Sequence, residues 1–178
     1  IITVQDTTKP ILSNVPESMT VSCEGEVPAA NINSVTATDG CGGTVTVRVS
    51  DVISNQSCAN RYEITRTWTA TDVCGNSSAA TQTIVVNDTI KPIFTGELPQ
   101  NITVDCDKIP ASINLSATDN CLGNVIVVFD EDAEGSNCPT YNIIRNWTAR
   151  DICGNETVYT QIITVQDTTK PILSNVPE

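Results

Sequence analysis

The residues with the clearest chemistry in this chain are its eight cysteines, which form two sets of four. The two sets occur at similar spacing along the chain: Cys23, Cys41, Cys58 and Cys74, then Cys106, Cys121, Cys138 and Cys153. The 178 residues include no histidine and no C-x-x-C pair, so zinc sites and dithiol redox sites lack their usual ligands. Even numbers of cysteines at matched spacing predict disulfides, and disulfides predict an oxidising, extracellular compartment.

Carboxylates are the second chemically useful group. The chain has 21 Asp and Glu against 9 Lys and Arg, a net charge of -12, which argues against nucleic acid or an anionic membrane as a direct partner. Aspartates recur near the boundaries of the repeats described below, and three converging carboxylates suit calcium, the one cofactor that the sequence suggests. The candidate ligand sets are Asp6, Asp39 and Asp72, and Asp88, Asp119 and Asp151. In the alternative interpretation, which we favour, each Asp caps its own turn by accepting backbone N–H bonds.

Catalytic motifs are absent from the sequence. Without histidine, and without a G-x-S-x-G, P-loop or dinucleotide-binding fingerprint, the chain lacks the usual nucleophile–base pairs and phosphate cradles. No apolar run approaches the length that a membrane span needs. We therefore expect neither an enzyme nor direct membrane insertion.

Internal repetition sets the domain organisation. Residues 1–17 recur unchanged as residues 162–178, D-T-T-K-P at 6–10 returns as D-T-I-K-P at 88–92, and W-T-A-T-D-V-C-G-N at 68–76 returns with two changes at 147–155. A period near 80 residues suits a small all-β domain. We predict a last-strand remnant of a preceding repeat at 1–5, complete repeats at 6–88 and 89–167, and the start of a following repeat at 168–178. The outer pieces should lack strand partners.

Alternation of apolar and polar residues predicts the strands. In repeat 1 these are 19–23, 34–39, 44–50, 62–71 and 79–87, and in repeat 2 they are 101–105, 114–119, 124–130, 140–151 and 157–166. Such strands predict tandem immunoglobulin-like antiparallel β-sandwiches. An odd number of strands brings the chain in at one end of a domain and out at the other, and a Lys-Pro step stiffens the connection. We therefore expect domains stacked end to end as a rod.

Strand direction also predicts the disulfides. Cys23 and Cys58 fall at one end of the first sandwich, and Cys41 and Cys74 fall at the other. Pairing cysteines at the same end predicts four bonds: Cys23–Cys58, Cys41–Cys74, Cys106–Cys138 and Cys121–Cys153. An extra strand within residues 51–58 would change this result.

Two arginines lie in phase with buried positions. Arg66 and Arg145 share the inward face of their strands with Trp68 and Trp147. We expect each arginine to lie over the neighbouring indole or to pair with an acid at the sheet margin.

The ordered motifs resemble a known family. D-T-T-K-P, P-x-x-x-T-V-x-C, A-T-D-x-C, W-T-A-x-D-x-C-G-N and Q-x-I-x-V-x-D follow one another as in hyalin-type, or HYR-like, repeats. The resemblance spans both complete repeats and is strongest to giant surface proteins of Bacteroidota, including gliding-motility adhesins. It implies an immunoglobulin-like fold, secretion and display on the cell surface. It also implies O-glycan acceptors at Thr7, Thr89 and Thr168.

The resulting functional hypothesis is mechanical. The repeats would act as spacers that project an adhesive tip and carry load during surface attachment and gliding. Their partners would be neighbouring repeats of the same chain, with other filament copies or surface polysaccharide as further candidates. Two alternatives stay open: a module that binds glycans or surfaces, and a hyalin-type repeat of an extracellular matrix.

Overall fold

The structure is a computed structural model that describes residues 1–135, 140–168 and 170. These residues form two compact units, one of residues 1–90 with 120–122, the other of 91–119 with residues 123 onward. Across the described ranges the regular elements are strands and two short 3-10 turns, η1 (Glu24–Glu26) and η2 (Ile32–Ser34). None of the described helices is long and apolar enough to span a membrane. The predicted all-β class is confirmed.

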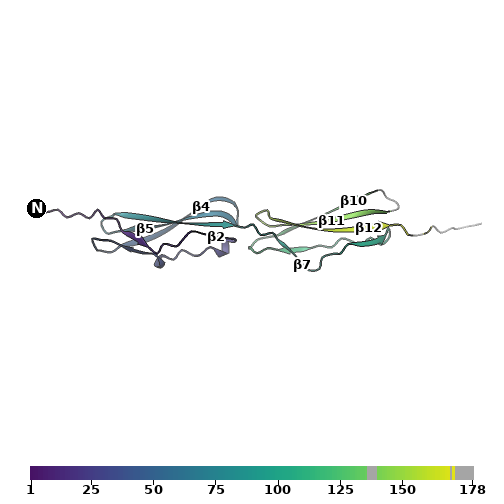
Figure 1. The fold of residues 1–178 in the computed structure, drawn as a ribbon, viewed down its shortest axis with the longest axis horizontal. Coiled ribbons are helices and arrows are strands. Elements are labelled where there is room, and N and C mark those ends of the chain that lie inside the picture. The colour runs from purple at the N-terminus through teal and green to yellow at the C-terminus, as the bar shows by residue number, and fades with distance from the viewer. Residues whose placement is uncertain (136–139, 169, 171–178) are drawn as a thin grey trace, which may run out of the picture. The chain divides into compact units, whose positions relative to one another are not determined.

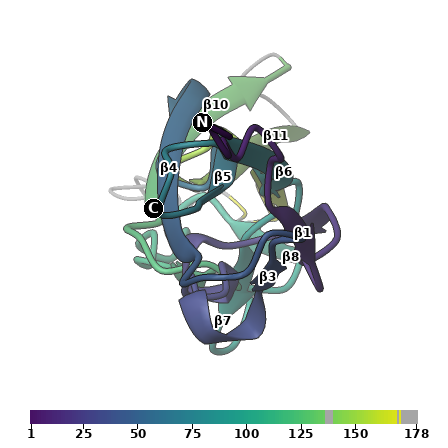
Figure 2. The same ribbon diagram turned by 90° about the vertical axis from the view of Figure 1, so that its left-hand side faces the viewer.

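The first unit has six strands in two sheets. They are β1 (Ile11–Ser13), β2 (Met19–Val21), β3 (Thr36–Thr38), β4 (Thr46–Cys58), β5 (Arg61–Thr71) and β6 (Ser77–Asn87). The larger sheet has the order β2-β6-β5-β4, while β1 pairs with β3. Figure 2 looks along this unit and shows β1 beside β3, and β4 beside β5. Within the larger sheet β2 and β6 are parallel and the other pairs are antiparallel, which gives a sandwich-like arrangement.

Period-2 alternation explains the central strand of this unit. Along β5 every second residue is buried, and this inward face carries Tyr62, Ile64, Trp68 and Ala70. Outward positions are mostly threonine, whose β-branched side chain suits an exposed strand face. Opposite β5, Ile84 of β6 is fully buried and completes the core.

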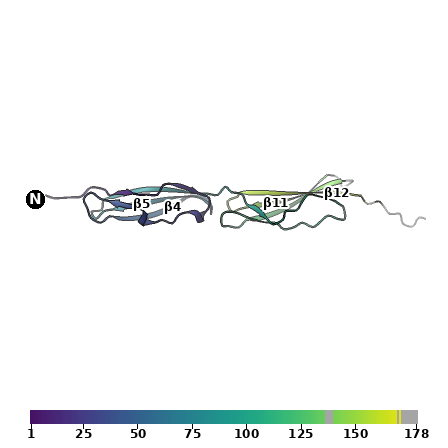
Figure 3. The same ribbon diagram turned by 60° about the horizontal axis from the view of Figure 1, so that its bottom comes forward.

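The second unit repeats this design. Its strands are β7 (Ile93–Thr95), β8 (Ile102–Asp105), β9 (Ser116–Thr118), β10 (Ile126–Glu134), β11 (Thr140–Arg150) and β12 (Glu156–Gln166). The sheet order β10-β11-β12-β8 and the pair β7-β9 match the first unit, with β8 parallel to β12. Figures 1 and 3 show β11 beside β12. Trp147, Ala149, Ile163 and Val165 occupy the core positions.

The two ends of the first unit hold different parts of the chain. At the end that we call proximal, Ser78 Oγ donates a hydrogen bond of 2.6 Å to the carbonyl of Pro10, where the repeat begins. At the distal end, the N–H of Asp88 donates to the carbonyl of Asn60 over 2.9 Å, as the chain leaves β6. The chain thus enters this sandwich at one end and leaves it at the other.

Strand boundaries differ from prediction in two informative places. Short strands β1 and β7 precede the expected set, and β4 runs on through residues 51–58 as one long strand rather than a strand plus an extra one. The directions assumed for the cysteine argument are therefore correct. Residues 1–5 form no strand, and the predicted start of a following repeat lies outside the described residues at 169 and 171–178.

Candidate functional site

A disulfide joins Cys23 to Cys121, two residues 98 positions apart. Their Cα atoms lie 5.2 Å apart, inside the usual range for a disulfide. Both side chains are buried, at 8% and 6% exposure. Cys23 follows β2 in the first sequence repeat, whereas Cys121 ends the A-T-D-x-C motif of the second. The bond lies within the first unit because residues 120–122 belong to that unit.

Two asparagines hold the flanks of this bond. Asn60 is 3% exposed, and its Oδ1 accepts a hydrogen bond of 2.9 Å from the N–H of Glu24. Its Nδ2 donates to the carbonyl of Leu122 over 3.5 Å. Asn120 Nδ2 lies 3.2 Å from the Sγ atoms of both Cys23 and Cys121. One buried amide thus contacts the residue after each bonded cysteine, and a second amide contacts the sulfurs themselves.

The remaining cysteines divide into bonded and reduced. Cys58 and Cys153 are each disulfide-bonded. Cys41, Cys74 and Cys106 are free and exposed. Cys138 lies outside the described residues.

The predicted disulfide pairing is wrong in all four of its bonds. Cys23 bonds Cys121 and not Cys58, which also excludes Cys121–Cys153, and Cys41 and Cys74 form no bond with each other. The fourth predicted bond, Cys106–Cys138, would need Cys106, which is reduced here. The strand directions placed the cysteines at the correct ends. The error was the assumption that two cysteines at one end must bond each other, because a cysteine at the end of a domain is also within reach of chain beyond that domain.

The two D-x-C-G-N segments are turns held by their own aspartates. Asp72 Oδ1 accepts hydrogen bonds from the N–H groups of Cys74 and Asn76 at 2.8 and 2.9 Å, and its Oδ2 accepts from the Asn76 amide at 2.9 Å. Asp151 makes the same bonds in the second unit, at 2.7 to 2.8 Å. Gly75 and Gly154 have φ of 90° and 84°, a region that other L-residues rarely adopt. The motif therefore encodes a turn, and its carboxylate is used by that turn.

A smaller acidic group lies at the proximal end of the first unit. Asp6, Asp39 and Cys41 have ligand atoms within 4.8 Å of one another, so the structure brings two of the three predicted carboxylates together but leaves Asp72 in its own turn. The N–H of Thr8 lowers the pKa of the Asp6 carboxyl by hydrogen bonding, with help from the Cys41 thiol. That hydrogen bond to Asp6 in turn raises the pKa of Cys41.

Two members of the second predicted set, Asp88 and Asp151, accept local hydrogen bonds. Asp88 is fully buried, its Oδ1 accepts from the N–H of Ile90 at 3.1 Å, and its carboxylate lies within 4.8 Å of Cys121 Sγ. That sulfur is in a disulfide and cannot act as a thiolate ligand. Asp119 is half-buried, and Asp151 holds its turn. Calcium binding at either set stays a prediction.

The buried arginines pair with acids on the neighbouring strand. Arg66 Nε and Nη2 each donate to Asp51 over 2.9 Å, and its Nη1 donates to the Pro28 carbonyl at 2.9 Å. Arg145 pairs with Glu131 at 2.6 Å in the equivalent place. The hydrogen bonds to Asp51 raise the pKa of Arg66 above its usual value. Of the two predicted uses, these contacts support pairing with an acid.

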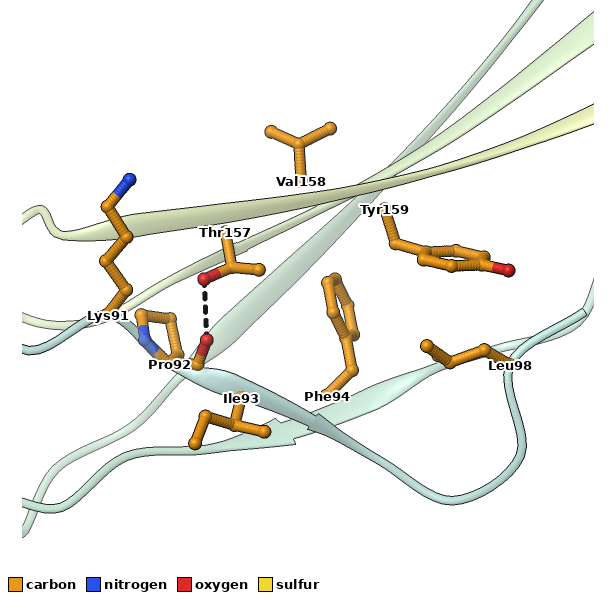
Figure 4. A pocket seen from close by; sticks show the side chains of 8 residues that line it. All are labelled: Lys91, Pro92, Ile93, Phe94, Leu98, Thr157, Val158 and Tyr159. Carbon is orange, nitrogen blue, oxygen red and sulfur yellow. Dashed lines mark hydrogen bonds between the residues drawn. The ribbon is translucent and has the colours of Figure 1, made fainter.

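An open groove of about 370 Å³ lies on the second unit (Figure 4). Phe94, Leu98 and Tyr159 form its apolar part, and the hydroxyl of Thr157 donates to the Pro92 carbonyl at 2.7 Å along its side. Tyr159 is fixed by a hydrogen bond of 2.7 Å from its hydroxyl to the Pro99 carbonyl. The groove therefore has a rigid aromatic wall.

The three threonines predicted as glycan acceptors are exposed. These are Thr7, Thr89 and Thr168. The hydroxyl of Thr168 donates to Asp105 Oδ1, so it is less available than the other two. Attachment of glycans at these sites stays a prediction.

Sequence reasoning missed the asparagines beside the disulfide and the aromatic groove. Asn60 has no counterpart asparagine in repeat 2, and Gly40 stands in repeat 1 at the position of Asn120. Tyr159 likewise corresponds to Ala80. The search for repeated residues could not find positions that the repeats do not share.

The described units thus define a class of protein: tandem all-β sandwich domains with cysteines at the domain ends. Residues 11–86 match the family described as "HYR-like domain with 4 cysteines", which supports the HYR-like repeat expected from the motifs.

A relative in curated sequences is the "Uncharacterized 81.3 kDa protein" of Acholeplasma phage L2. It is 29% identical over 176 residues, covering 91% of this chain and 23% of the relative. The chain therefore spans about a quarter of that protein's length.

Among solved structures, Drosophila N-cadherin EC1-4 is 16% identical with a TM-score of 0.37, over 89% of this chain and 50% of that one. Human CDH23 EC21-23 is 18% identical with a TM-score of 0.35, over 92% and 65%.

Proposed function

We propose that these repeats are non-enzymatic structural modules of a large secreted cell-surface adhesin, which space its adhesive part from the cell and bear tension. The observation that carries the proposal is the Cys23–Cys121 disulfide, which bonds cysteines of two successive sequence repeats. A bond of this kind shortens the length that a chain can reach when it is pulled. Such a disulfide suits a module that bears tension, because it limits how far the chain extends.

Strand topology within each unit supports the same role. The strand pair β2 and β6, near the start and end of the first repeat, is parallel, as is the pair β8 and β12 in the second. Tension that enters through the first strand of such a pair and leaves through the last loads their hydrogen bonds in shear. Bonds loaded in shear must break together, whereas bonds at an unzipping edge break one at a time. The arrangement suits resistance to pulling along the strands.

Passage of the chain from the proximal to the distal end of the first unit suits a linear series of domains. In our proposal further repeats continue this series end to end as a stiff shaft. Each junction contains the Lys-Pro step, which restricts the backbone there.

Single-molecule pulling tests the mechanical role. Cys23 and Cys121 are 98 positions apart, and with the disulfide closed this stretch adds no length. At about 3.4 Å per position it would add about 330 Å once the bond opens. Unfolding the oxidised chain should therefore give a total extension shorter than the reduced chain by at least this amount. The variant Cys74→Ser is the control and should keep the difference, because Cys74 is already reduced. Equal extensions in both states would contradict the proposal.

The gliding role is a finer part of the proposal and rests on the motif resemblance. If the parent protein is a mobile adhesin of gliding bacteria, fluorescent antibody fragments against these repeats should bind living cells and travel along them. A label that binds but stays fixed while cells glide would oppose this role and leave the spacer function intact.

A second candidate function, glycan binding, rests on the groove of the second unit. Aromatic rings such as Phe94 and Tyr159 can stack on sugar rings, and Lys91 lines the same groove. Phe94 points into this groove (Figure 4), so Phe94→Ala should remove one of the rings on which a sugar could stack. Binding on a glycan array that this variant abolishes would favour the binding module. Binding that persists in the variant, or no binding at all, would favour the spacer.

A further inference from the structure

The observed disulfide uses two kinds of cysteine, and each repeat contains one of each kind. Cys23 ends a T-V-x-C motif, whose copy in repeat 2 ends at Cys106. Cys121 ends an A-T-D-x-C motif, whose copy in repeat 1 ends at Cys41. Cys41 and Cys106 are thus the counterparts of the two bonded cysteines. Both are exposed and free in this chain.

Within one repeat the two kinds cannot meet. Cys23 lies at the distal end of the first unit, where its neighbour Glu24 is bound by Asn60. Cys41 lies at the proximal end, where its Sγ is 3.9 Å from the hydroxyl of Thr8. The 11 residues of β5 run between these ends, about 35 Å at the rise of a strand. A disulfide needs Cα atoms within about 7 Å, so the T-V-x-C cysteine and the A-T-D-x-C cysteine of one repeat cannot bond each other.

We propose that the Cys23–Cys121 bond is one step of a repeating ladder, in which the T-V-x-C cysteine of each repeat bonds the A-T-D-x-C cysteine of the next. Cys106 is then half of a bond to a following repeat. Cys41 is the other half of a bond to a preceding one. Because both residues are exposed, their sulfurs are accessible to a cysteine of a neighbouring repeat. In the ladder each of these two thiols has a bonding partner.

The second cysteine pair follows the same rule. Cys58, at the distal end of β4, corresponds to Cys138, and Cys153 corresponds to Cys74 in the D-x-C-G-N turn. The ladder pairs Cys58 with Cys153, each of which is disulfide-bonded. It pairs Cys74 with a preceding repeat, which explains why Cys74 and Cys41 are both reduced here although both lie at the proximal end.

Each new bond is a two-electron oxidation that needs an oxidant, for which we name a disulfide of the glutathione or oxidoreductase class. One thiolate attacks that disulfide, forms a mixed disulfide and releases one thiolate of the oxidant. The second protein thiolate then attacks the mixed disulfide, forms the protein disulfide and releases the other thiolate. In total, two protein thiols lose two protons and two electrons, and the oxidant is reduced to two thiols.

The first test is a disulfide map of the chain itself. The oxidised protein is alkylated without reduction, digested and analysed by mass spectrometry. Peptides that link Cys23 to Cys121 and Cys58 to Cys153, with Cys41, Cys74 and Cys106 alkylated, are expected. Peptides that link Cys23 to Cys58 or Cys41 to Cys74 would overturn the proposal.

The decisive test extends the chain by one repeat. Because residues 162–178 equal residues 1–17, adding a copy of residues 18–88 after Glu178 completes a third repeat with the sequence of the first. The map of this longer chain should link Cys106 to the copy of Cys41. Cys41→Ser in the copy should leave Cys106 alkylated, whereas Cys23→Ser in the copy should leave the Cys106 bond in place. A Cys106 that bonds Cys138 or stays reduced in the longer chain would overturn the ladder.

The ladder does not depend on the mechanical role. Bonds that follow the predicted map in a protein whose sandwiches unfold under very low pulling force would sink the load-bearing function and keep the ladder. The opposite result would sink the ladder alone.

Discussion

Removing either partner of the buried ion pair in the first unit should have unequal effects on stability. Arg66 has a side chain 5% exposed, whereas the side chain of its partner Asp51 is 38% exposed. Replacing Asp51 by Ala leaves a buried, charged guanidinium. Among the described residues its remaining hydrogen-bond acceptor is the Pro28 carbonyl, which binds one of its three nitrogens. Replacing Arg66 by Met leaves a carboxylate that water already reaches.

The expected magnitudes follow from this asymmetry. Breaking a fully buried pair by removing one partner costs about 3 to 5 kcal/mol. Water at the exposed Asp51 side reduces this figure, so Asp51→Ala should lower the free energy of unfolding by about 2 kcal/mol. Arg66→Met should cost about 1 kcal/mol or less, because an apolar side chain of similar length replaces the buried part of the pair. The double variant should be no less stable than Asp51→Ala, since its buried charge is gone.

Urea unfolding followed by tryptophan fluorescence measures these values. In a Trp147→Phe background the only tryptophan left is Trp68, which lies two residues from Arg66 on β5 and reports on the first unit. With a slope of about 1.5 kcal/mol per M, the midpoint of Asp51→Ala should fall by about 1.3 M. Equal costs for Asp51→Ala and Arg66→Met, or a double variant less stable than both, would refute the reasoning about the buried charge.

Three further predictions concern other polar groups. Trp147→Phe should lower the free energy of unfolding in urea by about 1 kcal/mol more than Trp68→Phe does. The reason is that the Trp147 indole donates to a backbone carbonyl at 3.0 Å, whereas the Trp68 indole N–H has no partner among the described residues. Equal losses of stability would contradict this. Asp6→Asn should make the Cys41 thiol react faster with iodoacetamide at neutral pH. The hydrogen bond with Asp6 raises the pKa of that thiol, so losing the bond increases the thiolate fraction. An unchanged pH profile of the reaction would count against this prediction. Asp151→Ala should lower the free energy of unfolding by about 2 to 3 kcal/mol, because three hydrogen-bond donors lose their acceptor. If the carboxylate serves only its turn, excess calcium should not restore the melting temperature of the variant in a calorimetric melt. A restored melting temperature would favour a metal site.

The fold could be predicted because its signals are local and repeated. Alternation along β5 marks the buried face directly, and the same pattern returns in β11, so two independent stretches of sequence agree. Short edge strands such as β1 escaped notice because three residues are too few for a period-2 pattern. The buried arginines were read correctly as inward-facing, since position on a strand fixes the face, but the choice of Asp51 as partner depends on strand register.

The disulfides show where reasoning from one repeat reaches its limit. Strand direction fixes the end of the sandwich at which each cysteine lies, and the structure has Cys23 at the distal end and Cys41 at the proximal end as that logic requires. Direction cannot say whether two cysteines at one end bond each other or bond chain from another repeat, because both choices satisfy the distance limit. Asn60 and Asn120 contact the bonded segments at Cys23 and Cys121, but the repeats do not share these residues, so they leave no periodic signal. A four-cysteine repeat of this kind has to be interpreted together with the repeat beside it.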